Sequence, residues 1–168
     1  MHERVKHHLE HHQAAYKAHF HKDLPLPISS PRDFAAALGY ELKRISKTLL
    51  LRDERGPSYY LIVLSCDRKV DLKMVADRIG CGRLELASRR ELEQLLGYPP
   101  QGVSPFGARG IQVMMDQALL ELPSVLVGAG EGGVEVEVSP HKLQEITQAI
   151  TLELSSRDSG TSTERDKL

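Results

Sequence analysis

The stretch SKTLLLRDERGPSYYLIVLS, residues 46–65, carries the strongest signal for the fold. It holds two apolar runs, at 48–51 and 59–64, on either side of the turn signal Arg55-Gly56-Pro57-Ser58. Two such runs around a Gly-Pro turn predict the strands of a β-hairpin. Each run is apolar at successive positions, which indicates that both faces of its strand are covered.

On both sides of the hairpin, helix and strand signals alternate irregularly. Helices are expected at 3–19, 31–38, 71–79, 88–96 and 140–154, and further strands at 83–86, 111–115, 124–127 and 134–138. Ser30 can cap the second helix, and Ser88 with Glu91 forms a capping box for the fourth. This pattern predicts a mixed α/β (α+β) single domain over residues 1–154. The polar composition of residues 155–168 predicts a disordered tail.

Composition limits the classes of function. The 168 residues include 22 Lys and Arg against 23 Asp and Glu, a formal net charge of −1. Proteins that coat nucleic acid usually carry a basic excess, so any such contact is expected to be local, at an end or in a pocket. The local basic candidates are Lys43, Arg44, Lys47, Arg83, Arg89, Arg90 and Arg109.

The location of the protein is expected to be cytoplasmic. No apolar run approaches the length of a membrane span, and the N-terminus lacks the apolar region of a secretory signal. The two cysteines, Cys66 and Cys81, form no CxxC pair and are compatible with reduced thiols in a cytosol.

Two segments could carry chemistry. Lys47, at the start of the first hairpin strand, offers a compact ammonium for a phosphate, or else points to water from the strand edge. The loop Gly102-Val103-Ser104-Pro105-Phe106-Gly107 favours a rigid turn whose N–H groups can face a ligand and stabilise an oxyanion, or else it is an ordinary connection. No GxSxG elbow surrounds Ser104, so it is not expected to be a nucleophile.

The N-terminal region is rich in histidine. His7 with His11, and His8 with His12, have the i,i+4 spacing that can chelate a metal. No HExxH or other complete ligand set accompanies them, so an exposed polar helix face is the favoured interpretation, and no functional metal is expected.

The acidic candidates lie in the C-terminal half. Glu135 and Glu137 alternate with valines in 134–138, which places both carboxylates on one face of a strand. Taken alone, this alternation favours a solvated strand face. Asp116 follows the expected strand at 111–115.

In their order and spacing, these segments resemble the YbaK/ProX-type aminoacyl-tRNA deacylases and the related editing domain inserted in bacterial prolyl-tRNA synthetases. The resemblance covers roughly residues 5–152. Its most specific part is Gly97-Tyr98 followed by 102–107. The other matching segments are 19–23, 34–39, 46–50, 61–64, 70–73, Asp116 and 133–138.

The resemblance implies a domain with a curved, mostly antiparallel sheet and a pocket for the 3′-terminal aminoacyl-adenosine of a tRNA. It implies that Lys47 anchors the phosphate or ribose of the terminal nucleotide. It also implies that Gly102, Ser104 and Pro105 shape the amino-acid pocket and position the ester. Together with Lys47, these three residues form the expected catalytic set. The further substrate-binding residues that it implies are Phe20, His21, Ser46, Val103, Phe106, Gly107, Asp116 and Glu135.

Two of these residues depart from the family pattern. Phe20 falls near a Tyr of some members, and Glu135 falls where some members have an Asp. Both departures bear on which amino acid is removed more than on the reaction.

The implied function is trans-editing: hydrolysis of a mischarged aminoacyl-tRNA that carries a small amino acid such as Ala, Cys or Ser, with tRNA-Pro as the expected carrier. An aminoacyl-tRNA synthetase is a further candidate partner; no cofactor, membrane or DNA is expected. An aminoacyl ester is already reactive, so a positioned water and backbone donors suffice for catalysis. Two alternatives remain: a catalytically weak, regulatory module that binds tRNA ends or nucleotides, and a metal-binding protein built on the His-rich helix.

Overall fold

The centre of the fold is a five-stranded sheet built on the predicted hairpin. The computed structural model describes residues 1–56 and 58–157, so Pro57 of the predicted turn lies outside the described residues. The strand order is β5-β2-β3-β6-β9. These strands are β2 (Ser46–Asp53), β3 (Tyr59–Ser65), β5 (Leu84–Leu86), β6 (Gln112–Asp116) and β9 (Ile150–Leu152). β2 and β3 pair antiparallel, with Ser46 opposite Ser65, as the hairpin signal predicts.

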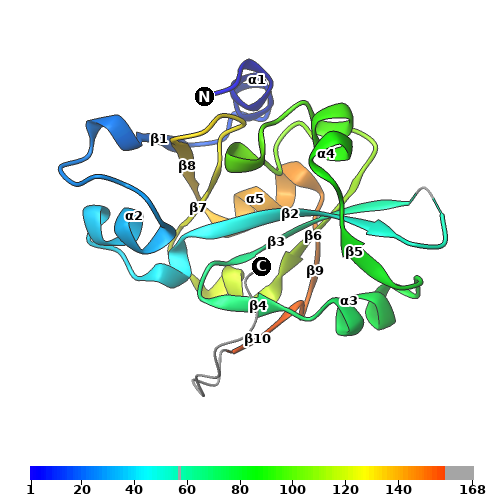
Figure 1. The fold of residues 1–168 in the computed structure, drawn as a ribbon. Coiled ribbons are helices and arrows are strands. Elements are labelled where there is room, and N and C mark those ends of the chain that lie inside the picture. Colours follow the sequence, from blue (N-terminus) through cyan, green and yellow to red (C-terminus); the bar gives the residue numbers. More distant parts are fainter. Residues whose placement is uncertain (57, 158–168) are drawn as a thin grey trace.

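A second sheet stands beside the first (Figure 1). It has the order β1-β8-β7 and consists of β1 (Tyr16–Phe20), β8 (Val134–Val138) and β7 (Val125–Gly128). A parallel bridge from Ile45 to Leu126 joins the two sheets. Of the seven strand pairings in the described residues, only β3–β6 and β6–β9 are parallel. The predicted fold class, a mixed α/β domain with a mostly antiparallel sheet, is confirmed.

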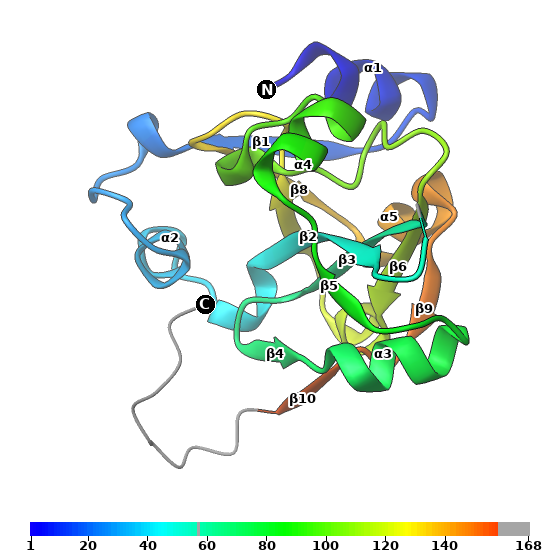
Figure 2. The same cartoon turned by 45° about the vertical axis from the view of Figure 1, so that its right-hand side comes forward.

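Five α-helices in the described residues cover these sheets: α1 (Glu3–His11), α2 (Pro31–Leu38), α3 (Leu72–Ile79), α4 (Arg89–Leu96) and α5 (Pro140–Thr147). Figures 1 and 2 show α1 and α3 at opposite ends of the molecule. None of the helices in 1–56 and 58–157 has the length and apolarity to cross a membrane.

Alternate residues of β3 enter different cores. Leu61 and Val63 belong to the main core, which also contains residues of α1, α4, α5 and the three-stranded sheet. Ile62 and Leu64 belong to a second cluster with residues of α3. All four are fully buried, and each stabilises the fold by about 1.5–3 kcal/mol. Both faces of this strand are therefore covered, as its apolar run predicts.

The predicted helix caps are present. The Ser30 hydroxyl accepts a hydrogen bond from the Asp33 N–H at the start of α2. Ser88 and Glu91 make the reciprocal bonds of a capping box at α4. These contacts satisfy N–H groups that have no partner inside a helix.

The predicted helix at 3–19 is wrong beyond His11, where α1 ends. Val5 and Leu9 are buried, but no apolar residue continues their stripe through the next turn. Gln13 adopts a left-handed conformation with φ 49°, and the chain then pairs with β8 as β1.

The C-terminal expectations also need correction. α5 ends at Thr147 rather than near 154, because Gln148 turns the chain at φ 54° and β9 then pairs with β6. The first three residues of the expected tail form β10 (Ser155–Arg157), paired with β4 (Arg68–Val70). Ser155 is buried and its hydroxyl donates to Asp116. Residues 158–168 lie outside the described residues.

Candidate active site

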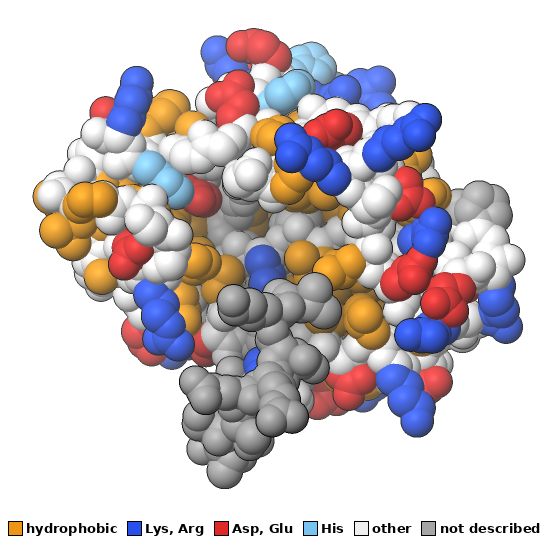
Figure 3. Space-filling model, in the orientation of Figure 1, with side chains coloured by type: hydrophobic (Ala, Val, Ile, Leu, Met, Phe, Trp, Pro, Cys, Tyr) orange, Lys and Arg blue, Asp and Glu red, His pale blue; other side chains and the backbone are white. Residues whose placement is uncertain are grey.

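A pocket of about 470 Å³ lies where the two sheets meet. Figure 3 shows it as a hollow in the middle of one face, with a basic side chain at its floor. Its volume is within the range of about 300–1,000 Å³ that small-ligand sites occupy. Its lining comes from β2, α2, β8 and the loop after the 3₁₀ turn Pro100–Gly102, and it includes His21, Ile28, Ser30, Phe34, Ser46, Lys47, Thr48, Leu49, Cys66, Gln101, Val103, Gly128 and Glu135.

Lys47 supplies the positive charge of this pocket. It is the only Lys or Arg among the described residues that line it. β2 carries it opposite Leu64, in the half of the strand that β5 leaves unpaired. Burial raises the pKa of the neighbouring Cys66 thiol to about 11, which disfavours the reactive thiolate.

His21 and Glu135 form an acid–imidazole pair in the same pocket. Nε2 of His21 lies 2.5 Å from Oε2 of Glu135. The pairing of β1 with β8 brings these two segments together, and the His21 N–H donates to the Gly133 carbonyl at 2.9 Å. Burial raises the pKa of Glu135, although His21 opposes this effect. The predicted solvated face for Glu135 is wrong, because β8 is a central strand and this side chain is largely buried.

Thr48 is a pocket residue that the sequence did not single out. Its hydroxyl Oγ1 is buried and has no hydrogen-bond partner among residues 1–56 and 58–157. Leaving such a group unpaired costs about 1–3 kcal/mol, which a ligand atom in the pocket can offset. The preceding hydroxyl, Ser46 Oγ, is already engaged, because it donates to the Leu126 carbonyl at 2.7 Å and so links the two sheets. The available signals for Thr48 were its position next to Lys47 and its place in the matching segment 46–50.

The glycine–proline loop shapes one wall of the pocket by close packing. Val103 lines the pocket, and a Cβ on Gly128 would lie 2.2 Å from its carbonyl oxygen. A Cβ on Gly102 would lie 2.4 Å from the backbone carbon of Glu131. The Gly102 N–H donates to the Pro99 carbonyl at 3.0 Å, so it is engaged in its own turn. Only glycine permits the close approach at either position.

Comparison with known proteins identifies the family. Residues 26–146 match the family model described as the aminoacyl-tRNA editing domain. The chain belongs to the aminoacyl-tRNA editing domain family. The predicted membership of the YbaK/ProX-type deacylases, and with it the prediction of an enzyme, is confirmed.

Relatives of this editing domain carry related names. The prolyl-tRNA editing protein ProX of Acetoanaerobium sticklandii is 34% identical over 110 residues, which cover 62% of this chain and 67% of that protein. A protein of Enterococcus faecalis that bears the name Cys-tRNA(Pro)/Cys-tRNA(Cys) deacylase EbsC is 27% identical over 131 residues, covering 77% and 79% of the two chains. A crystal structure described as a trans-editing enzyme for prolyl-tRNA synthetase superposes with a TM-score of 0.79 at 27% identity, covering 91% of this chain and 95% of that chain.

The editing-domain pocket contains only part of the residue set expected from the sequence. His21, Ser46, Lys47, Val103 and Glu135 line it. Ser104, Pro105, Phe106 and Gly107 are buried behind it and are absent from the described lining. Ser104 Oγ accepts from the Phe106 N–H at 3.2 Å, and the Tyr98 hydroxyl donates to the Phe106 carbonyl at 2.7 Å. These residues brace the loop.

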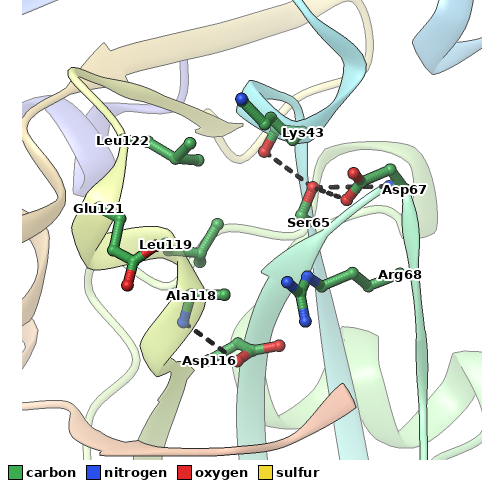
Figure 4. A pocket seen from close by; sticks show the side chains of 9 residues that line it. All are labelled: Lys43, Ser65, Asp67, Arg68, Asp116, Ala118, Leu119, Glu121 and Leu122. Carbon is green, nitrogen blue, oxygen red and sulfur yellow. Dashed lines mark hydrogen bonds between the residues drawn. The ribbon is translucent and has the colours of Figure 1, made fainter. Parts of the chain in front are cut away.

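Phe20 and Asp116 also lie outside this pocket. Side chains alternate along a strand, so Phe20 points away from the face of His19 and His21 and packs against the main core. Asp116 lines a separate pocket of about 400 Å³ (Figure 4). Its carboxylate accepts from the Ala118 N–H and the Ser155 hydroxyl, which indicates that it anchors the start of β10.

Within the described part of the chain, no three His, Cys, Asp or Glu side chains are grouped closely enough to hold an ion. His8 is turned inward instead, with its Nε2 3.0 Å from the Ile146 carbonyl.

Proposed function

We propose that this editing-domain protein is a trans-editing hydrolase that removes a small amino acid, such as alanine, cysteine or serine, from mischarged tRNA-Pro. The names of the ProX and EbsC relatives support this substrate class. A synthetase pocket gains only about 1–3 kcal/mol from one methylene group, so small amino acids escape discrimination and require later removal.

The observation that carries the proposal is the placement of opposite charges in one pocket. Lys47 from β2 and Glu135 from β8 both line it. We assign the Lys47 ammonium to a phosphate or ribose oxygen of the 3′-terminal nucleotide, since a compact cation suits such an oxygen. We assign Glu135, oriented by His21, to the α-ammonium of the attached amino acid.

Apolar side chains from three segments complete the pocket. Ile28 and Phe34 come from the α2 region, Leu49 from β2 and Val103 from the loop. They offer an apolar surface for a small side chain, while the buried Thr48 hydroxyl is assigned as a donor to the ester oxygen. In the reaction, a water oxygen bonds to the ester carbonyl carbon, the bond from that carbon to the ribose oxygen breaks, and the ribose oxygen takes the proton that the water gives up. The products are the free amino acid and a tRNA with its 3′-terminal hydroxyl restored.

The alternative of a catalytically weak binding module rests on the departures at Phe20 and Glu135. Phe20 packs against the main core, so the absence of a hydroxyl at this position does not change the pocket. Glu135 retains the carboxylate that an Asp would supply. Hydrolysis is therefore the better supported function.

The setting of the reaction is part of the same proposal. We propose that the protein acts in the cytoplasm and that prolyl-tRNA synthetase is its partner. Support for this partner comes from the similar crystal structure, whose protein is described as a trans-editing enzyme for that synthetase.

The test is a deacylation screen over a complete panel of aminoacyl-tRNAs, mischarged species included. We expect release of one small amino acid from tRNA-Pro well above the spontaneous rate. Binding of aminoacyl-tRNA without release of any amino acid would replace the hydrolase with the binding module.

A further inference from the structure

One side of α1 carries a row of basic side chains that the proposed reaction does not use. Arg4, His7, His8 and His11 recur at i, i+3, i+4 and i+7, which places them on one face of the helix. With Gly107 and Arg109 they line a pocket of about 210 Å³, here called the α1 pocket. Every side chain in this lining is cationic or can be protonated, and none of the described lining residues is acidic.

The opposite side of α1 fixes the helix to the protein. Val5 and Leu9 are fully buried in the main core. The His2 N–H donates to the Ala129 carbonyl at 2.9 Å, and the terminal ammonium lies 2.8 Å from a Glu131 carboxylate oxygen. The basic face is therefore displayed from an anchored helix.

The loop side of the α1 pocket depends on glycine. Gly107 and Gly110 both have φ of +73°, and they flank the exposed Arg109. A Cβ on Gly107 would lie 2.7 Å from Cγ of Arg4, so the loop passes against α1 only because this side chain is absent. The same loop contributes Val103 to the active-site pocket. The two pockets are therefore built on one continuous loop.

Some groups in the α1 pocket are engaged and others are available. Arg4 donates to the Leu96 carbonyl at 2.5 Å, and His8 lies against the Ile146 carbonyl. In the described parts of the chain, His7, His11 and Arg109 have no carboxylate partner. The His7 and His11 rings are stacked with centroids 6.1 Å apart.

We propose that the α1 pocket binds a phosphate of the tRNA backbone beyond the terminal nucleotide, and so adds affinity for the acceptor stem. This inference rests on the proposed function. The pocket is smaller than the usual range for small-molecule sites, which suits a phosphodiester group rather than a nucleoside. Imidazole donates hydrogen bonds even when neutral, and a guanidinium binds phosphate through two parallel bonds.

Charge and location favour a nucleic-acid phosphate. The whole chain has a formal net charge of −1, so attraction to RNA has to come from local clusters. Figure 3 shows His, Lys and Arg side chains, with acidic ones among them, at the end of the molecule where Figure 1 places α1.

The test compares two substrates of the same enzyme: the full aminoacyl-tRNA and a short 3′ fragment that carries the same aminoacyl ester. The variant combines His7→Ala, His11→Ala and Arg109→Ala, all at exposed positions. We expect KM for the full tRNA to rise about tenfold or more with kcat unchanged, since contacts to phosphate are charge-assisted. The fragment should react at the wild-type rate. The dependence of kcat/KM on salt should become shallower for the full tRNA only.

The matched control combines Lys6→Ala with Arg78→Ala. Lys6 is exposed on α1 outside the pocket lining, and Arg78 lies on α3 at the far end of the molecule. The control removes two permanent cations and the triple variant removes one, so a purely bulk charge effect would raise KM at least as much in the control. That outcome would overturn the inference, as would an unchanged KM in the triple variant or an equal loss with the fragment.

Failure of the proposed function would leave a different signature, because no substrate would be deacylated by any variant. In that case, binding of uncharged tRNA measured by fluorescence anisotropy decides the inference. Weaker binding by the triple variant than by the control supports the α1 pocket as a phosphate site, and equal binding overturns it.

Discussion

Two neighbouring positions of β8 each pair a glutamate with a histidine, yet the two pairs have different surroundings. Glu137 meets His19 with Oε2 and Nε2 2.7 Å apart, and Glu135 meets His21 at 2.5 Å. Both glutamates project from the same strand face, and both histidines come from β1 or the residue after it. Chemistry and strand position are nearly identical.

The difference lies in what else reaches each carboxylate. Glu137 also accepts from Arg44 at 2.8 Å and from the Ser124 hydroxyl at 2.5 Å, with the Tyr40 hydroxyl at 3.3 Å. Burial alone would raise the pKa of Glu137, but the Ser124 hydroxyl, His19 and Arg44 together lower it. Because these additional donors occupy the Glu137 carboxylate, the Glu137–His19 pair has a structural role.

Glu135 has only His21 as a side-chain partner among the described residues, and its pKa is raised by burial. Its remaining acceptor capacity faces the pocket that holds Lys47. An acid–imidazole pair thus becomes available to a substrate when its surroundings leave it unsaturated.

We expect the largest loss of activity at Lys47. This variant tests whether the pocket that contains the Glu135–His21 pair is the functional one. Lys47→Ala should lower kcat/KM about ten- to over a hundredfold, because it removes a charge-assisted contact worth about 1.5–3 kcal/mol. The melting temperature should stay within error. Lys47→Arg should also be impaired, because a planar guanidinium does not fit a point-charge site. Wild-type kinetics for Lys47→Ala would remove the basis for placing the tRNA end in this pocket.

The next largest effect is a loss of activity at Glu135 that is not expected at Glu137. Glu135→Gln should lower kcat/KM about tenfold or more, because a neutral amide no longer pairs with the substrate ammonium. Its unfolding free energy should not fall, since the buried charge is removed while a hydrogen-bonding group remains. Steady-state kinetics and urea unfolding measure both quantities. Equal activity losses in Glu135→Gln and Glu137→Gln would break the distinction.

Glu137→Gln should act on stability instead. Arg44 is largely buried, with its side chain 16% exposed, and would lose its counter-charge. We expect the free energy of unfolding to fall by about 1–3 kcal/mol, with activity per folded molecule nearly retained. Thermal melting and active-site-normalised rates check this. A stable variant with reduced turnover would instead place Glu137 in the reaction.

The smallest effect is the pH dependence of stability, where the two glutamates should have opposite signs. The lowered pKa of Glu137 means that its stabilisation is present above the unfolded pKa, about 4.5, and is lost as the pH falls through the folded pKa. The raised pKa of Glu135 means that stability declines as the pH rises from the unfolded value through the folded one.

Urea unfolding of the wild type and both glutamine variants, from about pH 4 to pH 7, measures these slopes. As the pH rises toward neutral, the free energy of unfolding of Glu137→Gln should fall further below that of the wild type. That of Glu135→Gln should rise relative to the wild type. Differences of the same sign would show that both carboxylates have equivalent surroundings.

The sequence alone determined the features that depend on neighbouring residues. The hairpin at 46–65, the Ser30 cap and the Ser88–Glu91 box are local, because their interactions join positions close in the chain. Order and spacing of motifs also identified the family and placed Lys47 at the mouth of β2, where the pocket is found.

Only the tertiary structure decided which distant residues meet. β1, β9 and β10 are strands because β8, β6 and β4 offer them partners, which no local periodicity in 16–20, 150–152 or 155–157 reveals. The β1–β8 register gives Glu135 and Glu137 their histidines. The path of the chain places Asp116 and Lys47 in separate pockets, and it leaves the Thr48 hydroxyl without a hydrogen-bond partner in the described part of the chain. The physical reason is that burial and pairing are set by contacts across the whole chain, whereas a sequence pattern reports only the preferences of adjacent residues.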